Sequence, residues 1–373
     1  MGDLRENIRS SILREDFEHV LKMTLPLWEE LRGRRIFITG GTGFVGTWLL
    51  GSFAWANREL RLNAEAIVLT RDGAAFSRKV PWLVDDSSIK LYPGDVRDFK
   101  FPEGEFSLVI HGATEASSKL NAENPLLMLD TIVQGTRRTL DFAHQCQAQK
   151  VLFISSGAVY GKQPSEMTHV TEDYRGAPYT MEPMAAYGEG KRAAEFLCSI
   201  FSKQYLIETK VARCFAFVGP YLPLDSHFAV GNFIRDGLNG GPIRVIGDGT
   251  PFRSYLYAAD LAIWLWTILA NGKSCRAYNV GSEDEIAVRE LALTVAKAFD
   301  PVPVVQIAGM PTAGHCAERY VPSIRRAETE LRLRSVVSLP EGIRRTISFH
   351  DQEKRGDRPP RSYERAAPES STT

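Results

Sequence analysis

The sequence has no excess charge of either sign and no long apolar run. Its 373 residues include 45 Lys and Arg and 45 Asp and Glu, so the formal net charge is zero. Nucleic-acid and membrane-surface proteins usually carry a basic excess, which this chain lacks. No apolar run reaches the roughly 20 residues that span a bilayer, and the N-terminus lacks the basic-then-apolar layout of a signal peptide. We therefore expect no nucleic-acid partner and no membrane partner.

Cysteine is scarce as well. The five cysteines are odd in number and far apart, so they form no disulfide framework and no metal-type pair. The seven histidines are scattered too, and we predict no metal site. A reducing cytoplasm is the expected location. The length is enough for one large domain, or for a domain with a smaller lobe.

The stretch from Arg34 to Leu50 is the most informative in the chain. Ile36 to Ile38 form a short apolar run typical of a buried strand, and Gly40, Gly43 and Gly46 follow at three-residue intervals. In a strand–turn–helix unit, the first glycine supplies a tight turn, the second lets the backbone approach a pyrophosphate, and the third lets the helix pack on the strand. The helix N-terminus suits a phosphate anion. The alternative is a glycine-rich turn that binds no ligand.

A second strand is predicted over residues 66–71, and its end should meet the adenosine ribose of a dinucleotide. An acidic residue there binds the 2′-hydroxyl of NAD, whereas a guanidinium suits the 2′-phosphate of NADP. The chain has Thr70 and Arg71 at this point, followed by Asp72. We predict NADP, and NAD recognised by Asp72 is the alternative.

Strands and helices alternate along the following residues. Strands are predicted over 89–96, 107–114, 151–156 and 210–217, with helices at about 124–148 and 185–203. Such alternation predicts an α/β fold with a Rossmann-type, doubly wound parallel sheet and right-handed crossovers. Ligands of this fold bind where the strands end.

We divide the chain into four parts. Residues 1–32 are expected to form a helical arm, interrupted at Pro26, that packs on the domain or on a second subunit; a lid is the alternative. Residues 33–218 form the dinucleotide-binding domain, to which segments of the C-terminal half return. Residues 219–350 form a smaller α/β substrate lobe, with helices near 229–239 and 259–271 and a strand at 243–246. Residues 351–373 are polar and are expected to be disordered.

Three side chains are candidates for catalysis. Ser156 ends the fifth predicted strand, and Tyr187 and Lys191 are spaced i, i+4 on the next long helix, so they share a face. A tyrosine with its ordinary pKa near 10 is a poor base at neutral pH, but a nearby ammonium favours the phenolate. Tyr187 would then exchange a proton with a sugar hydroxyl while hydride leaves or returns to the carbon. The alternative is a Tyr/Lys pair on an ordinary amphipathic helix.

Together these stretches resemble the extended short-chain dehydrogenase/reductase superfamily, in its NAD-dependent epimerase/dehydratase branch that acts on nucleotide sugars. The resemblance runs from about Arg34 to His350. It rests on Gly40–Gly46, Gly94–Val96, Ser155–Gly161, Tyr187–Lys191, Val218–Pro220 and Pro242–Arg253.

The resemblance implies a set of site residues and a nucleotide-diphosphate sugar as substrate. Ser156, Tyr187 and Lys191 carry the catalytic roles. The cofactor-binding positions are Gly40, Thr42, Gly43, Phe44, Val45, Gly46, Thr70, Arg71, Asp95, Val96, Ala113, Tyr187 and Lys191. The substrate-binding positions are Glu115, Ser156, Arg253 and Arg319. A homodimer through the helices near 124–148 and 185–203 is also implied.

The chain departs from the family pattern at several positions. Members that eliminate water carry an Asp-Glu pair after the catalytic hydroxyl residue, and decarboxylases usually keep the Glu; here these positions are Gly157 and Ala158. Elimination needs a carboxylate base, so dehydration is disfavoured, and Ala158 counts against a decarboxylase as well. A carboxylate from elsewhere in the chain, Glu115 or Glu172, is the alternative source of a base. Ala216 and Ile132 replace two asparagines of the family pattern, which affects a diphosphate contact and a structural hydrogen bond.

The leading hypothesis is therefore an epimerase that inverts a sugar carbon, most simply C4, with a bound NAD(P) as a temporary hydride store. An NADPH-dependent 4-keto-sugar reductase is the first alternative, which Arg71 favours. A nucleotide-sugar dehydratase or decarboxylase is the second. A hypothesis of a different class is a non-catalytic NADP sensor, which would not need an acid/base pair.

Overall fold

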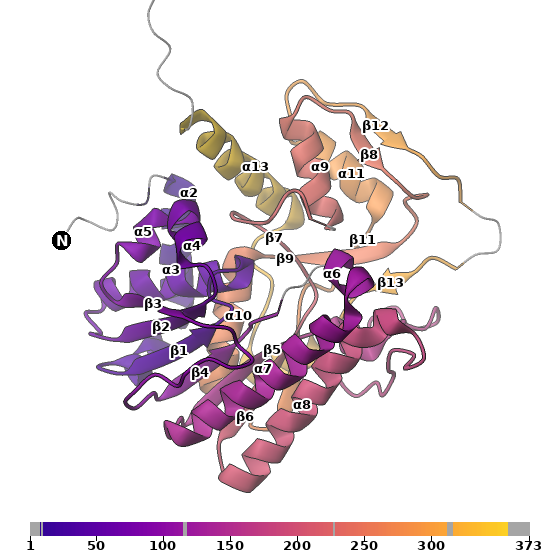
Figure 1. Ribbon diagram of the computed structural model, residues 1–373. Helices are drawn as coiled ribbons and strands as arrows, with labels where there is room; N and C mark the ends of the chain where they lie inside the picture. The colour runs from indigo at the N-terminus through magenta and orange to yellow at the C-terminus, as the bar shows by residue number, and fades with distance from the viewer. Residues whose placement is uncertain (1–7, 9, 115–117, 227, 312–315, 357–373) are drawn as a thin grey trace, which may run out of the picture.

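A seven-stranded parallel sheet forms the centre of the molecule (Figure 1). The structure, a computed structural model, describes residues 8, 10–114, 118–226, 228–311 and 316–356. The sheet has the order β10-β6-β5-β4-β1-β2-β3, with every neighbouring pair parallel. Its strands are β1 (Arg35–Thr39), β2 (Glu65–Thr70), β3 (Ile89–Pro93), β4 (Leu108–His111), β5 (Lys150–Ser156), β6 (Glu208–Cys214) and β10 (Arg276–Val280). The predicted doubly wound α/β fold is confirmed.

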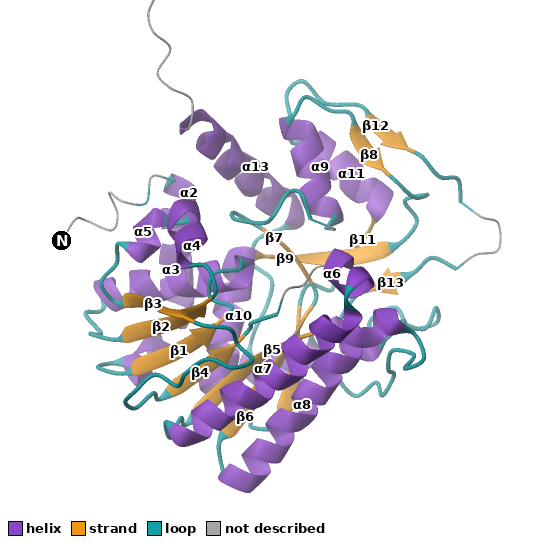
Figure 2. Cartoon of the chain, in the orientation of Figure 1, coloured by secondary structure: helices purple, strands orange, loops and turns teal. Residues whose placement is uncertain are grey.

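Helices cover both faces of this sheet (Figure 2). Alternate residues of each strand point to opposite faces, so Ile36 and Ile38 join one apolar cluster and Phe37 joins another. The first face packs against α3 (Phe44–Glu59) and α10 (Ala258–Asn271), and the second against α7 (Pro125–Gln145) and α8 (Ala186–Tyr205). Shorter helices at this unit are α4 (Gly73–Lys79), α5 (Pro81–Val84), α6 (Ser118–Glu123) and the 3₁₀ turns η2 (Gly157–Tyr160) and η3 (Pro183–Ala185).

The strand predicted over 210–217 is two strands. The chain leaves the central sheet after Cys214, and the next strand, β7 (Ala216–Val218), pairs in parallel with β9 (Phe252–Tyr257) instead. The prediction was wrong here because one apolar run can serve two sheets in succession, and periodicity does not report the change of partner.

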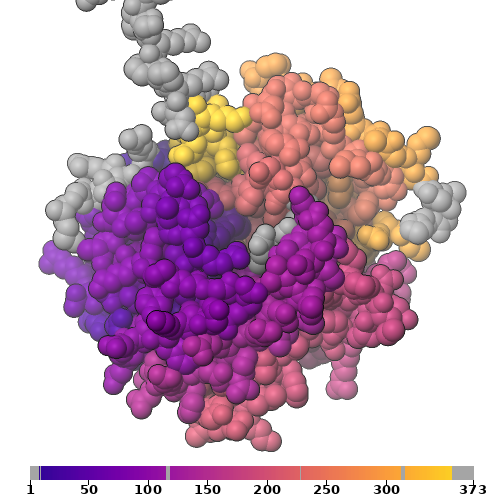
Figure 3. All heavy atoms as spheres, viewed as in Figure 1, coloured from indigo at the N-terminus to yellow at the C-terminus, as the bar shows by residue number. Residues whose placement is uncertain are grey.

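The C-terminal half builds a smaller unit and also completes the central one. A second sheet has the order β11-β9-β13, with β7 also on β9, and β8 pairs with β12. From this half, strand β10 joins the central sheet beside β6, and helix α10 packs on one face of that sheet. Figure 3 shows the two units side by side on one face of the molecule. The remaining elements are α9 (Ala229–Leu238), β8 (Ile243–Val245), β11 (Glu285–Ala287), α11 (Val288–Ala296), β12 (Val305–Ile307), β13 (Arg319–Tyr320), α12 (Arg325–Leu331) and α13 (Leu339–Gly356).

The N-terminal arm is part of the core. Its helix α2 (Ser11–Thr24) ends before Pro26, and a 3₁₀ helix, η1 (Leu25–Leu31), follows. Phe17 packs so closely on α3 that a Cβ on Gly51 would lie 2.3 Å from the Phe17 ring. The buried Asp16 binds Tyr257 and, on α13, Arg345. The arm therefore packs on the domain, and its described residues form no lid over the strand ends.

The end of the chain differs from the expectation of a tail from residue 351. Helix α13 continues to Gly356, and Lys354 donates a hydrogen bond of 3.0 Å to Asn239. Residues 357–373 lie outside the described part. The polar residues 351–356 remain helical because they extend a helix whose earlier turns, with Ile343 and Ile347, are buried in the core.

Candidate functional site

The glycine turn lies between β1 and α3. The absence of a side chain has a different geometric reason at Gly40, Gly43 and Gly46. Gly40 has a φ of +75°, and a Cβ on it would lie 2.5 Å from the backbone of Gly112. A Cβ on Gly46 would lie 2.3 Å from the Cα of Gly41, so helix and turn touch backbone to backbone. At Gly43 a Cβ would meet only one atom within 4 Å, at 3.5 Å. The chain therefore leaves the space at Gly43 open, next to the first backbone N–H groups of α3.

Thr42, Phe44 and Val45 complete the turn, and the end of β4 lies beside it. The backbone N–H of Ala113 donates a hydrogen bond of 3.2 Å to the Thr39 hydroxyl. The same hydroxyl lies 2.7 Å from Nδ1 of His111, whose pKa burial lowers to about 3. His111 is therefore a neutral residue of the core at neutral pH.

A polar pocket adjoins the end of β2. Its volume is about 230 Å³, and it is lined by Thr42, Thr70, Arg71, Asp72, Ala75, Phe76 and Lys79. Asp72 caps α4 by accepting a hydrogen bond of 2.8 Å from the Ala75 N–H. One carboxylate oxygen is thus engaged in the helix cap. Lys79, which is exposed to solvent, lies at the edge of the same pocket. Two cations therefore border the place predicted for the ribose.

Asp95 and Val96 follow the end of β3. The Arg97 guanidinium beside Asp95 lowers the pKa of that carboxyl, through two hydrogen bonds of 2.8 and 3.0 Å. Val96 is buried against α7, where a Cβ on Gly135 would lie 2.8 Å from it.

Lys191 is held under the end of β5. It is only 2 % exposed, and its Nζ donates hydrogen bonds to the carbonyl of Ile154 at 2.8 Å and to the Thr114 hydroxyl at 3.1 Å. Burial lowers its pKa to about 8. The ammonium lies 5.9 Å from the centre of the Tyr187 ring, as expected of residues one helical turn apart.

Tyr187 faces the same region, but its electrostatics differ from the expectation. Burial raises the pKa of Tyr187, and a hydrogen bond with Ser156 opposes that rise. The sequence argument expected the Lys191 charge to lower this pKa. Desolvation has the larger effect in the structure: Lys191 is buried and Tyr187 is partly buried beside it. The Tyr187 phenol is therefore protonated at neutral pH.

Ser156 is the point at which three side chains meet. Its Oγ accepts a hydrogen bond of 3.2 Å from the Ala158 N–H, and it is the polar neighbour that opposes the rise in the pKa of Tyr187. It also lies 3.5 Å from the hydroxyl oxygen of Tyr320, on β13. The sequence argument missed Tyr320. The only signal was its position beside Arg319, because neighbouring strand residues point to opposite faces.

The two predicted substrate arginines lie on opposite faces of the β9–β13 ladder. Arg253 is paired in register with Tyr320, and its charge opposes the rise in that tyrosine's pKa. Arg319 points the other way, with its guanidinium 4.3 Å from the centre of the Phe252 ring and an ion pair to Glu285. The structure thus brings Arg253 towards the catalytic side chains and does not bring Arg319 there.

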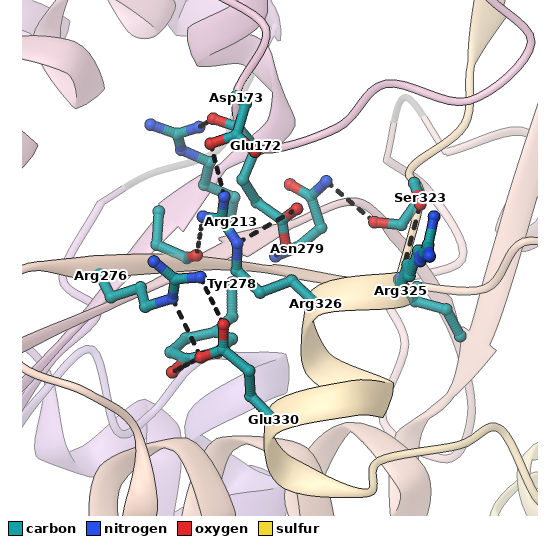
Figure 4. A network of polar contacts seen from close by, with 12 residues as sticks. Glu172, Asp173, Arg213, Arg276, Tyr278, Asn279, Ser323, Arg325, Arg326 and Glu330 are labelled. Atoms are coloured by element: carbon teal, nitrogen blue, oxygen red, sulfur yellow. Dashed lines mark hydrogen bonds and ion pairs between the residues drawn. The ribbon is translucent and has the colours of Figure 1, made fainter.

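Of the two carboxylates that the sequence offered in place of the missing Asp-Glu pair, Glu172 is bound to other partners. Glu172 belongs to a buried network, shown in Figure 4, in which it accepts a hydrogen bond of 2.9 Å from the Asn279 N–H and lies 3.8 Å from Arg326. Burial raises the pKa of Glu172. Glu115 lies outside the described residues.

The structure also shows what surrounds the two residues that replace asparagines of the family pattern. Ile132 is fully buried, and a Cβ on Gly190 would lie 3.1 Å from it, so apolar packing of α7 on α8 occupies the asparagine position. Ala216 begins β7. Across the described ranges, no helix is long and apolar enough to cross a bilayer, and no three His, Cys, Asp or Glu side chains form a group that could hold a metal ion.

Comparison with known proteins places this geometry in a family. The model of the NAD dependent epimerase/dehydratase family matches residues 36–281. UDP-glucuronic acid decarboxylase 1 of Danio rerio is 31% identical over 95% of this chain and 80% of its own. An Arabidopsis thaliana protein of the same name is 29% identical over 84% of this chain and 69% of its own.

Solved structures agree with this result. The Thermus thermophilus UDP-glucose 4-epimerase in complex with NAD has a TM-score of 0.70 and 26% identity, over 85% of this chain and 99% of that one. The dTDP-glucose 4,6-dehydratase DesIV of Streptomyces venezuelae, with NAD bound, has a TM-score of 0.71 and 27% identity, over 86% and 98%. The chain belongs to the NAD-dependent epimerase/dehydratase family of nucleotide-sugar-modifying enzymes.

Proposed function

We propose that this protein oxidises a hydroxyl-bearing carbon of a nucleotide-diphosphate sugar, with Tyr187 as the acid/base. The observation that carries the proposal is the convergence of Ser156, Tyr187 and Lys191 at the strand ends beside the open Gly43 turn. The names of the similar 4-epimerase and 4,6-dehydratase structures favour C4 as the carbon. A non-catalytic sensor would have no use for this constellation.

The turn and the strand ends fit a dinucleotide. Gly43 and the N-terminus of α3 would hold the pyrophosphate, and Asp95 and Val96 would border the adenine. When bound, the nicotinamide ring accepts hydride from the sugar carbon and can return it. Tyr187 takes the hydroxyl proton as hydride leaves the carbon, and its positive neighbour Lys191 stabilises the phenolate that a base requires. Ser156 donates to the oxygen that becomes a ketone.

For the step after oxidation, we favour loss of CO₂ from a nucleotide hexuronic acid. The support is the similarity to decarboxylases over most of both chains. A carboxylate on C5 is β to a ketone at C4, so the C–C bond breaks with its electron pair moving to the ketone oxygen. The cleavage itself needs no carboxylate base, although Ala158 stands where decarboxylases usually keep a Glu. A proton from solvent then adds to C5, hydride returns to C4, and Tyr187 gives its proton back to the C4 oxygen.

Epimerisation at C4 is the second candidate, and the small residues Gly157 and Ala158 favour it. The 4-keto intermediate would be reduced from its other face. Neither path requires the carboxylate base that dehydration needs. Glu172, which could have supplied such a base, is bound within the network of Figure 4. Net reduction of a 4-keto sugar uses the same side chains in reverse and is the third candidate.

Incubation with separate nucleotide sugars tests the proposal. UDP-glucuronic acid labelled with ¹³C in the carboxyl group should yield labelled CO₂ and a new pentose anomeric signal in NMR spectra. UDP-glucose and dTDP-glucose, tested in parallel, would yield a C4 epimer if the second candidate holds. Failure of every sugar in the panel to react with either NAD or NADP would refute the proposed function.

We also propose NADP as the cofactor. Arg71 and Lys79 border the pocket at the end of β2, and Thr42 and Thr70 add two hydroxyls. Two cations and two hydroxyl donors suit a 2′-phosphate dianion. The Asp72 carboxylate, which NAD recognition would use, already caps α4.

A homodimer is proposed from the outer surface of α7 and α8. Phe196 and Ile200 are one turn apart on α8 and are 66% and 36% exposed, and Leu126 at the start of α7 is 66% exposed. Large apolar side chains that lie on one helix face in this way favour burial against a second copy.

A further inference from the structure

The Tyr320 phenol occupies the space beside the catalytic serine. Its ring packs on Phe215 with 4.7 Å between ring centres. A Cβ on Gly157 would lie 2.7 Å from the Tyr320 hydroxyl and 2.7 Å from Phe215. The phenol and a side chain at position 157 therefore cannot occupy this space together. The residue after the serine is glycine because β13 fills that volume.

The register of β13 fixes the direction in which Tyr320 points. This strand has two residues, and in its parallel pairing with β9 Arg319 lies opposite Phe252 and Tyr320 lies opposite Arg253. Arg319 stacks on Phe252 on one face. Tyr320 is consequently directed to the other face, where Ser156 lies.

The hydrogen bonds around Ser156 leave a defined place for a donor. A serine hydroxyl has one proton to donate and two lone pairs to accept with. The Ala158 N–H occupies one lone pair. Tyr320 lies 3.5 Å away, which is longer than the 2.7–2.8 Å usual for two hydroxyls, but catalytic hydrogen bonds often shorten when substrate binds.

Tyr320 is suited to donate at all pH values at which the protein works. Burial raises the pKa of Tyr320, and the neighbouring Tyr187 raises it further, while Ser156 and Arg253 oppose the rise to a smaller extent. The phenol therefore keeps its proton, and among the described residues Ser156 is the polar partner of its hydroxyl.

We propose that Tyr320 is a positioning residue that donates its hydrogen bond to Ser156 and thereby directs the Ser156 proton towards Tyr187 and the reacting sugar oxygen. With both lone pairs of the serine occupied, its single proton has only those two acceptors. Ser156 then stabilises the Tyr187 phenolate and the ketone oxygen in turn. This inference rests on the proposed acid/base role of Tyr187.

A titration without substrate tests the inference separately from the proposed function. Tyrosinate absorbance near 295 nm is followed against pH with NADP⁺ present, and the step that is lost in Tyr187→Phe is assigned to Tyr187. In Tyr320→Phe this step should move to higher pH, because Ser156 stabilises the phenolate less. Tyr174→Phe is the matched control: Tyr174 belongs to the same apolar cluster and stacks near Tyr160 at 6.3 Å.

Kinetics on the nucleotide sugar that reacts in the panel described above give the second readout. Tyr320→Phe should lower kcat by roughly tenfold, the effect of one hydrogen bond, with KM within twofold and the rising limb of the pH profile displaced upward. Gly157→Ala, which displaces the phenol, should reproduce both changes. An unmoved Tyr187 step in Tyr320→Phe, or a rise in KM alone, overturns the inference. An inactive wild type overturns only the proposed function, because the titration still reports on Tyr320.

Discussion

Tyr187 and Lys191 are one turn apart on α8, and burial shifts their two pKa values in opposite directions. The pKa of Tyr187 rises and that of Lys191 falls to about 8, so both groups are displaced towards their neutral forms. Burial disfavours the charged form of each group, because a phenolate or an ammonium inside the protein lacks the hydration that it has in water. A dinucleotide with a positive ring, placed beside Tyr187, would add the charge that favours the phenolate.

Replacement of Tyr187 by Phe should abolish most turnover. Removing a general acid/base typically costs about 10²–10⁴ in rate. The dinucleotide should still bind, because its phosphate-binding turn is untouched. Steady-state kinetics and cofactor fluorescence measure the two effects, and Tyr205→Phe, at the far end of the same helix, is the control. A Tyr187→Phe protein with more than a tenth of the wild-type kcat would exclude the acid/base role.

The pocket at the end of β2 should select the cofactor. Arg71→Ala and Lys79→Ala should each raise the Kd for NADPH by roughly 10- to 100-fold, as expected when a charged hydrogen bond is lost. The Kd for NADH should change little, because it lacks the 2′-phosphate. Fluorescence titration measures both. Arg78→Ala, on the exposed side of α4, is the control. Equal weakening of both cofactors would argue against a phosphate site.

The exposed apolar face of α8 should determine the oligomeric state. Phe196→Glu would place a charge in a buried interface and should convert a dimer to a monomer in light-scattering measurements. Leu293→Glu is the matched control, since Leu293 is 49% exposed on α11 of the other unit. A wild type that is monomeric at micromolar concentration would contradict the proposal.

The buried carboxyl of Asp16 should make stability depend on pH. Burial raises its pKa from 3.8 to about 6, against the effects of Tyr257 and Arg345. The folded state then holds a proton that the unfolded state has released between pH 4 and 6, so the free energy of unfolding falls as pH rises through this window. The loss is about 3 kcal/mol.

Urea unfolding at pH 4.5 and pH 7 measures this effect. Other carboxyl groups also titrate, so the quantity of interest is the difference between the wild type and Asp16→Asn, in which this pH dependence is absent. Glu29→Gln, on the exposed side of η1, should retain the wild-type difference. Parallel pH profiles for the wild type and Asp16→Asn would show that Asp16 does not titrate in this range.

Local features of the fold could be predicted from the sequence, and long-range register could not. The βα turn at Gly40 follows from glycine spacing, because its geometry is decided by residues next to one another. The change of sheet at Phe215 and the direction of Tyr320 depend on β9, which lies far along the chain. The family resemblance implied Arg319 and gave no sign of Tyr320, and a two-residue strand has no periodicity from which the direction of either side chain could be predicted.

The sequence predicted which ionisable residues lie together, but not whether burial or the neighbouring charge would dominate their pKa values. The sequence predicted that Lys191 and Tyr187 share a helix face, and they do. The sequence did not indicate how far each side chain would be buried, because this depends on how β5, α6 and β13 pack around them. The commitment of Glu172 to Asn279 and Arg326 was likewise hidden, because its partners lie more than a hundred residues away.

The pairing of Asp16 with Arg345 links positions 329 residues apart in the chain. At about 5–20 residues per second, a ribosome needs on the order of tens of seconds to pass from one to the other. For most of that interval the nascent chain has made α2 but not α10, which covers the same face of the sheet, and α13 follows only at its end. Aromatic side chains such as Phe17 and Trp48 would stay accessible to chaperones until these two helices have been made.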